Sequence, residues 1–204
     1  MIVAGQGGKA DVFGVTIDGA RLLVKDFAPR ALWARILGRL QIAREAAAYE
    51  QLAGVSGVPA FVGRIDASAL AIEWVDGERL AFAEIRPADA PALVAKLRAI
   101  LDAIHARGVV HNDLRGRENV LLRRDGNLAV VDFAASLRLR PGGLAHTAFF
   151  RFFAMADEAA FLKWKGMIAP GSYTVEDRAF LARFERWRAL WPFNPKRRKA
   201  GRAA

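Results

Sequence analysis

The sequence predicts an α+β fold of two lobes, in which a small antiparallel sheet with one helix precedes a mainly helical half. Short apolar or alternating runs, separated by Gly and Asp-Gly turns, occupy most of residues 1–75, which is typical of strands. Longer segments farther along repeat apolar residues at helical spacing. Of the 204 residues, 53% are hydrophobic, which is enough for a packed core and too many for a disordered chain.

Four strands and one helix are predicted in the first lobe, residues 1–75, after a short apolar run at its start. The runs VFGVTI and ARLLVKDF flank Asp18 and Gly19, a pair that favours a hairpin turn. GVPAFVGRID and ALAIEWVDG are two more predicted strands, and the second is an inner strand that leads into an extended linker. Residues 30–54 are predicted to be helical from apolar positions at helical spacing: Leu32, Ile36, Leu40, Ala43 and Ala47.

The second lobe, residues 76–195, is predicted to be helical apart from one hairpin. Residues 91–108 place six apolar side chains on one helical face: Leu93, Val94, Leu97, Ile100, Leu101 and Ile104. The run NVLLRRDGNLAVVDF predicts a strand, an Asp-Gly turn and a second strand. Two more helices are predicted at residues 149–166 and 174–191, and residues 196–204 form a basic tail.

Positive charge is concentrated in the last third of the chain, whose net charge as a whole is +10. Residues 1–132 carry 17 Lys and Arg against 16 Asp and Glu, whereas residues 133–204 carry 14 against 5. We expect this region to face an anionic partner, such as a membrane leaflet, lipopolysaccharide or nucleic acid. For residues 196–204 alone, a solvated end explains the charge equally well. The aromatic and basic segment AFFRFFAM is predicted to pack in the core, with contact to lipid headgroups as the alternative.

Several classes of protein and site are excluded by composition. No run of eighteen uncharged apolar residues exists, so no transmembrane span is predicted. The N-terminal residues lack the basic start and apolar run of a signal peptide. The absence of Cys excludes disulfides, and the three His residues are not spaced like zinc ligands. We therefore expect a cytoplasmic protein, or one held peripherally on the inner face of an anionic membrane.

A Gly-rich segment, GQGGKADV, lies between two predicted strands. Gly5 and Gly7 would let backbone N–H groups approach phosphate oxygens. The spacing is that of G-x-G-x-x-G-x-V with Ala10 in place of the third Gly. A strand follows where a dinucleotide-binding turn needs a helix, and no Gly-Lys-Ser/Thr follows as in a P-loop. A plain hairpin turn is the alternative.

Two further strand features have chemical potential. Lys25 interrupts an apolar strand and needs a partner or a ligand there, and Glu45 in the following helix could pair with it. A Lys on an edge strand that faces water is the alternative. The backbone groups near Glu73 and Val75, where an inner strand gives way to a linker, could meet the edge of an adenine.

The loop HNDLRGREN and the following AVVDFA contain the most specific pattern. Asp113 can supply the fixed carboxylate that a general base requires. Asn119 and Asp132 can supply the hard oxygen ligands that metal ions bridging phosphates require. His111 is predicted to brace the loop.

In their order along the chain, these features resemble the protein-kinase-like superfamily, and in particular its small atypical bacterial branch, akin to RIO-type kinases and lipopolysaccharide Kdo kinases. The resemblance covers residues 1 to about 135, and its spacings suit that scaffold. It implies ATP and Mg²⁺ as cofactors. It also implies that Gly5 and Gly7 cover the phosphates and that Lys25, steadied by Glu45, contacts the α- and β-phosphates.

For catalysis, the resemblance implies that Asp113 is the base and that Asn119 and Asp132 hold Mg²⁺. Arg115 lies where a cation could neutralise charge on the transferred phosphoryl group. Asp113 and Asn119 are six residues apart where the family pattern has five, so Glu118 is an alternative to Asn119 as the second ligand. The family's final Gly of D-F-G is Ala134.

The predicted function is therefore ATP- and Mg²⁺-dependent transfer of a γ-phosphoryl group to a hydroxyl acceptor by a serine/threonine-protein-kinase-like enzyme. Two alternatives remain open. One is a kinase of lipopolysaccharide or of another lipid-linked sugar, which the basic C-terminal third favours. The other is a nucleotide-binding pseudokinase that acts as a scaffold.

Overall fold

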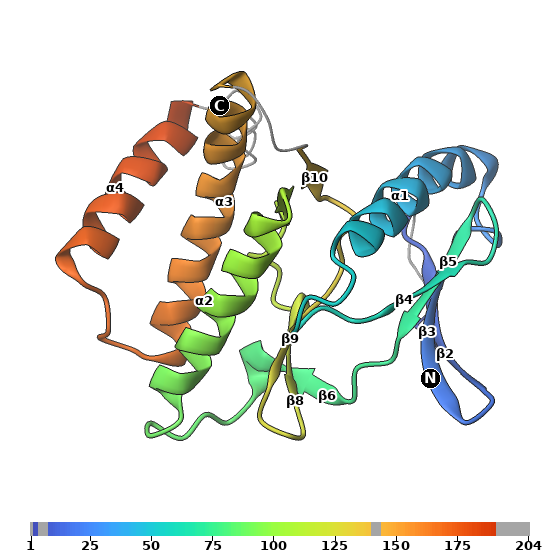
Figure 1. Ribbon diagram of the computed structural model, residues 1–204, viewed down its shortest axis with the longest axis horizontal. Helices are drawn as coiled ribbons and strands as arrows, with labels where there is room; N and C mark the ends of the chain where they lie inside the picture. Colours follow the sequence, from blue (N-terminus) through green and yellow to red (C-terminus); the bar gives the residue numbers. More distant parts are fainter. Residues whose placement is uncertain (1, 4–7, 140–143, 191–204) are drawn as a thin grey trace, which may run out of the picture.

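The computed structural model describes residues 2–3, 8–139 and 144–190, and only the backbone at residues 2–3, 144–148 and 187–190. A sheet with one helix forms one end of the molecule, and three helices lie side by side at the other end (Figure 1). This arrangement confirms the predicted α+β class with a small antiparallel sheet and a mainly helical second half.

The first lobe is built on a five-stranded sheet with the order β1-β2-β3-β5-β4, in which every neighbouring pair is antiparallel. The strands are β1 (Ile2–Val3), β2 (Asp11–Ile17), β3 (Ala20–Asp26), β4 (Phe61–Arg64) and β5 (Ala69–Glu73). Asp18 and Gly19 both have positive φ angles, of 48° and 79°, as the tight turn of the β2–β3 hairpin requires. The inner position of β5 confirms its sequence prediction.

Helix α1 (Leu32–Gln51) packs mainly on β4 and β5. Its buried face consists of Ala34, Gly38, Ile42, Glu45, Ala46, Ala48 and Tyr49. The predicted helix is therefore confirmed, but the large apolar residues whose spacing predicted it, Leu32, Ile36 and Leu40, lie on the exposed face. The helix approaches closely because Gly38 faces Phe27, and a Cβ atom at Gly38 would come within 2.3 Å of that ring.

The second lobe combines three helices with two small sheets. The three-stranded sheet has the order β6-β8-β9, and β10 pairs with β7. The elements are β6 (Gly77–Arg79), the 3-10 turn η1 (Leu80–Phe82), α2 (Ala90–Ala106), β7 (Val109–Val110), β8 (Val120–Arg123), β9 (Leu128–Val130), β10 (Leu137–Arg138), α3 (Leu144–Ile168) and α4 (Val175–Leu190). The β8–β9 hairpin was predicted; the short strands β6, β7 and β10 were not.

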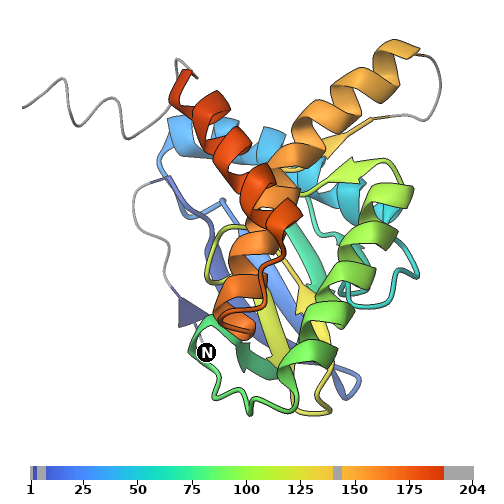
Figure 2. The same ribbon diagram turned by 90° about the vertical axis from the view of Figure 1, so that its left-hand side faces the viewer.

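Helix α2 buries the apolar face that the sequence predicts, with Val94 at its margin. Helix α3 begins at Leu144, five residues earlier than predicted, and its N-terminal end extends past α2 (Figure 2). In this part of α3, Phe149 is exposed whereas Phe152 and Phe153 are half-buried, so the aromatic segment packs in the core only in part. None of the described helices is long and apolar enough to cross a membrane.

Candidate active site

A pocket of about 370 Å³ lies where the five-stranded sheet meets the β8–β9 hairpin. Val12, Leu23 and Ile72 contribute apolar side chains from the sheet, and Leu121 contributes one from β8. Lys25, Asn119 and Asp132 line it as well, together with Glu73 and Val75. Six residues singled out from the sequence, counting Glu118, thus come together around one hollow.

The ion pairs of Lys25 dominate one end of this pocket. Its Nζ atom donates to Glu45 Oε1 at 2.8 Å and to Asp132 Oδ1 at 2.7 Å. The Lys25 side chain is 13% exposed and that of Glu45 is fully buried, whereas that of Asp132 is 43% exposed. The Lys25–Glu45 pair expected from the sequence is present, and the carboxylate of Asp132 completes the cluster.

Burial and charge act against each other on these three groups. Burial opposes the charged form of Lys25, but attraction to Glu45 and Asp132 outweighs it and raises the pKa of Lys25 above its usual value. Burial also raises the pKa of Glu45, and the attraction of Lys25 offsets this only in part. For Asp132, the charge and hydrogen bond of Lys25 overcome burial and lower the pKa. Asp132 is therefore a carboxylate at neutral pH.

The segment after β5 offers backbone groups at the opposite end of the pocket. The carboxylate of Glu73 accepts hydrogen bonds from Ala60 N and from Arg123 Nη1, each at 3.0 Å. The Glu73 side chain is thus used to fix this segment. The N–H of Val75 has no hydrogen-bond partner within the described chain. Trp74 packs its ring against Gly14 and under the guanidinium of Arg21, which closes the side of the pocket.

The loop from His111 to Asn119 places an exposed carboxylate beside an amide. Asn119 Nδ2 donates to Asp113 O at 2.7 Å and lies 3.3 Å from Asp113 Oδ2. Glu118 turns outward to Arg79, at 3.0 Å, although it also touches the rim of the pocket. Arg115 is half-buried in the same loop.

Asp157 of α3 fixes the backbone at the start of this loop, a role that the sequence analysis did not predict. This buried carboxylate of α3 accepts hydrogen bonds from His111 N at 2.7 Å and Asn112 N at 2.8 Å. It also contacts His105 Nε2 at 3.0 Å. The one available signal was the acidic pair Asp157 and Glu158 within a largely apolar stretch of helix, because a carboxylate that is buried there requires partners.

His111 itself is fully buried and braces the loop, as predicted. Its Nε2 atom lies 3.0 Å from Val131 O, and its Nδ1 atom accepts from Asp113 N at 3.3 Å. The His111 ring packs on Phe133, whose ring meets Tyr49 edge-on at 5.1 Å. Tyr49 in turn stacks on Phe61 of β4. A continuous column of rings therefore joins the loop to α1 and to the first sheet.

Backbone strain is found at two positions of the site. Only three non-glycine residues of the described chain have positive φ, and two of them are Asn112, at 64°, and Asp132, at 67°. Such conformations cost about 1–3 kcal/mol and persist where the surroundings enforce them, often at functional sites. At Asp132, the backbone N–H points to the Tyr49 hydroxyl at 3.4 Å.

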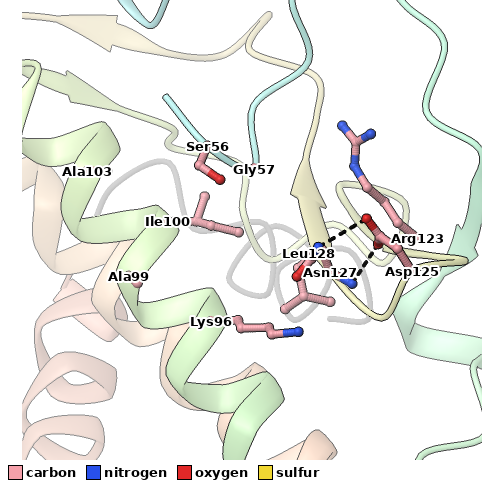
Figure 3. A pocket seen from close by; sticks show the side chains of 10 residues that line it. All are labelled: Ser56, Gly57, Lys96, Ala99, Ile100, Ala103, Arg123, Asp125, Asn127 and Leu128. Carbon is pink, nitrogen blue, oxygen red and sulfur yellow. Dashed lines mark hydrogen bonds between the residues drawn. The ribbon is translucent and has the colours of Figure 1, made fainter. Parts of the chain in front are cut away.

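A second hollow, of about 460 Å³, lies between α2 and the β8–β9 turn (Figure 3). None of the candidate site residues predicted from the sequence lines it. Its polar groups are largely engaged with one another: Asp125 accepts from Asn127, and Lys96 Nζ donates to Gly126 O at 2.7 Å. The chemistry is therefore concentrated at the first pocket. The predicted phosphate-covering residues, Gly5 and Gly7, lie outside the described residues.

Comparisons with known proteins agree with this geometry. No family model matches the chain. A segment of 83 residues is 36% identical to CBL-interacting serine/threonine-protein kinase 21 of Arabidopsis thaliana, and one of 47 residues is 47% identical to serine/threonine-protein kinase PKH3 of Saccharomyces cerevisiae. These segments cover 39% and 23% of this chain but 20% and 5% of the two kinases, so the chain spans at most a fifth of their length.

Among solved structures, the chain is similar to the Rio2 kinase of Chaetomium thermophilum, seen in an ADP/Mg²⁺-phosphoaspartate complex. The TM-score is 0.61 and the identity 16%, over 89% of this chain and 60% of that one. At this identity the likeness shows the fold alone. The fold is that of the protein-kinase-like proteins, and together with the kinase segments it supports a place for the chain in that superfamily.

Proposed function

We propose that the chain is a phosphotransferase that uses ATP and Mg²⁺ to phosphorylate a hydroxyl group. The observation that carries the proposal is the meeting of Lys25, Glu45 and Asp132 at the end of a pocket that Asn119 also lines. A fixed cation beside hard oxygen ligands suits a triphosphate and its metal ion. The kinase-like fold and the kinase segments support a kinase-like phosphotransferase in general.

ATP would lie with its base toward Val75 and its phosphates toward Lys25. The free N–H of Val75 and the backbone of Glu73 suit the edge of an adenine, and the apolar walls of the pocket suit its faces. Lys25 would contact the α- and β-phosphates while Glu45 fixes its position. Gly5 and Gly7 would cover the phosphates.

Asn119 and Asp132 would hold Mg²⁺. The amide nitrogen of Asn119 is engaged by Asp113, which leaves Oδ1 as a free oxygen donor, and Asp132 presents a half-exposed carboxylate. Oxygen ligands of this kind fit Mg²⁺. No cluster of three or more Asp, Glu, His or Cys side chains that could hold a metal occurs in the described chain, so phosphate oxygens and water would complete the coordination. When bound, Mg²⁺ neutralises phosphate charge.

In the reaction, the acceptor hydroxyl transfers its proton to the carboxylate of Asp113, and its oxygen forms a new bond to the γ-phosphorus. The bond between that phosphorus and the β–γ bridging oxygen breaks, and ADP leaves. Arg115, in the same loop, would neutralise charge on the transferred group. The exposure of Asp113 leaves it open to an acceptor.

A lipid-linked sugar or lipopolysaccharide is a second candidate acceptor beside a serine or threonine side chain. Helix α3 begins only twelve residues after Asp132, which leaves little chain for a platform that would seat a protein substrate. The basic C-terminal third favours an anionic acceptor.

We place the enzyme in the cytoplasm, with peripheral contact to an anionic membrane through that third. Truncation after Pro195 should then weaken vesicle binding while ATP binding is preserved. Equal vesicle binding after truncation would contradict a role for the tail.

The decisive experiment supplies γ-labelled ATP and Mg²⁺ to the pure protein with separate protein, lipid and lipopolysaccharide pools. We expect label in one pool, loss of that label in Asp113→Asn, and its retention in Asp125→Asn, a matched change at an exposed Asp in the β8–β9 turn. Binding of ATP without label transfer to any pool would instead support a pseudokinase.

A further inference from the structure

The outer face of α1 is apolar and has no cover among the described residues. It carries five large side chains that are 54% to 70% exposed: Leu32, Trp33, Ile36, Leu37 and Leu40. The inner face of the same turns is made of Ala34, Gly38 and Ile42. The first half of α1 therefore directs its larger apolar side chains away from the sheet, which is the reverse of an ordinary surface helix. An apolar patch of this kind marks an interaction site.

The charged residues of this segment of the chain are all cations. Between Asp26 and Glu45 the sequence has no acidic residue but contains four arginines: Arg30, Arg35, Arg39 and Arg44. With about 100° between successive residues of a helix, Arg39 falls just outside the apolar stripe beside Leu32, and Arg44 falls within its opposite edge, between Trp33 and Leu37. Both side chains are exposed, and neither makes an ion pair within the described part of the chain. The face thus combines exposed aromatic and aliphatic groups with free positive charge.

We propose that the outer face of α1 docks on an anionic lipid bilayer. Helices that lie in a membrane interface bury an apolar face with Trp and Leu and carry Arg or Lys beside it, and the five residues with Arg39 and Arg44 match this pattern. A symmetric second copy fits less well, because a two-fold interface sets the same patch against itself. The arginines of both copies would then meet with no acidic side chain from this segment to neutralise them.

Docking at this face would affect the proposed active site through two contacts of α1. Trp33 packs over Gly8, at the end of the Gly-rich segment, where a Cβ atom would lie 3.0 Å from its ring. Farther along the same helix, Glu45 pairs with Lys25 on the inner side. This consequence rests on the proposed phosphotransfer, whereas the docking itself does not, and vesicle binding tests the docking without any activity.

The first test is sedimentation of the full-length protein with sucrose-loaded vesicles at low salt. We expect binding to vesicles of phosphatidylcholine with phosphatidylglycerol and little binding to phosphatidylcholine alone. Ile36→Asp/Leu40→Asp should lower the partition coefficient about tenfold or more, because both changes place a charge in the outer face that would enter the bilayer. Arg39→Gln/Arg44→Gln should lower it by about fivefold for each arginine removed, less after screening.

Matched controls lie outside both α1 and the basic C-terminal third. Phe82 is 62% exposed, so Phe82→Asp tests a new charge at an exposed apolar position elsewhere. Arg86→Gln/Arg124→Gln removes two cations that are each 82% exposed. All controls should bind vesicles like the wild-type protein, and circular dichroism should show unchanged melting for every variant.

The second test locates the contact by quenching of Trp fluorescence with brominated lipids. Quenching should fall strongly in Trp33→Phe although sedimentation persists. Wild-type binding that does not distinguish anionic from neutral vesicles, or wild-type sedimentation by Ile36→Asp/Leu40→Asp, would overturn the proposal. Quenching that persists in Trp33→Phe would assign the contact to another part of the chain, and light scattering that shows a dimer disrupted by the Asp variants would assign the face to a second copy.

Discussion

Replacement of Lys25 by Met should destabilise the fold, and more strongly at pH 8 than at pH 5. Glu45, the partner of Lys25, is fully buried. Its second oxygen, Oε2, has no hydrogen-bond partner in the described structure, so Lys25 is the main group that compensates the charge. Removal of one member of a buried ion pair costs about 3–5 kcal/mol, because the other charge stays buried and uncompensated. Met retains most of the length of the Lys stem, so a cavity adds little to this cost.

The pH dependence follows from the carboxyl group of Glu45. Burial raises the folded-state pKa of Glu45 above its usual value, although Lys25 acts to lower it. A raised folded-state pKa favours the protonated folded form, so the stability from this group is present at low pH and is lost as pH rises through the folded pKa. Without Lys25 the pKa of Glu45 rises farther, and the deficit of the variant therefore grows as pH rises from the folded-state pKa of the wild type to that of the variant.

Urea unfolding of four proteins at pH 5 and pH 8 measures this effect: the wild type, Lys25→Met, Glu45→Gln and the double variant. The double variant should recover much of the loss at pH 8, because it leaves no buried charge at Glu45. Lys96→Met is the matched control, since Lys96 donates only to a carbonyl oxygen at an exposed turn, and it should cost about 1 kcal/mol or less. Equal unfolding midpoints for Lys25→Met and the wild type at pH 8 would show that Lys25 does not stabilise the fold by compensating the charge of Glu45.

Three further predictions concern the loop and the residues behind it. Asp113→Ala should lower turnover about 10²- to 10⁴-fold with unchanged melting; near wild-type turnover would remove it as the base. Asn119→Ala should reduce Mg²⁺-dependent activity more than Glu118→Ala, because Glu118 is 67% exposed and turned outward; the reverse order, measured by Mg²⁺ titration of activity, would show Glu118 to be the ligand. Tyr49→Phe keeps the ring column but removes the hydroxyl that accepts from the strained Asp132 N–H. Urea unfolding should therefore show a loss of stability of about 1 kcal/mol. An unchanged unfolding midpoint would mean that this contact does not support Asp132.

Local signals were sufficient for most elements of the first lobe. The Asp-Gly turn requires positive φ at both residues, so the β2–β3 hairpin and its register could be read from a short stretch. Once β3 and α1 were placed, a pair between Lys25 and Glu45 could be expected, because a Lys in an apolar strand needs a partner and Glu45 lies in the helix that follows. Asp157 could not be found in this way. Its bonds to the loop cross 45 and 46 positions of sequence, and no local pattern records such a contact.

The orientation of α1 could not be predicted for a different physical reason. The spacing of apolar residues shows which of them share a face of a helix. It identifies that face as the buried one only when the opposite face is polar. In the first half of α1 both faces are apolar, and the face with the larger residues is the exposed one. The face with the smaller side chains packs against the sheet because the helix must approach closely there, as the contact of Gly38 with Phe27 shows.

That close approach is what brings the two halves of the proposed site together. Phe27 directly follows β3, the strand that carries Lys25, while Gly38 and Glu45 lie on the inner face of the same helix. A side chain at Gly38 would clash with Phe27 and push α1 away from β3, and the 2.8 Å ion pair between Lys25 and Glu45 could not survive such a shift. The small inner face is thus required by the ion pair. The apolar outer face has no such role within the described fold, so its side chains point to a partner outside it.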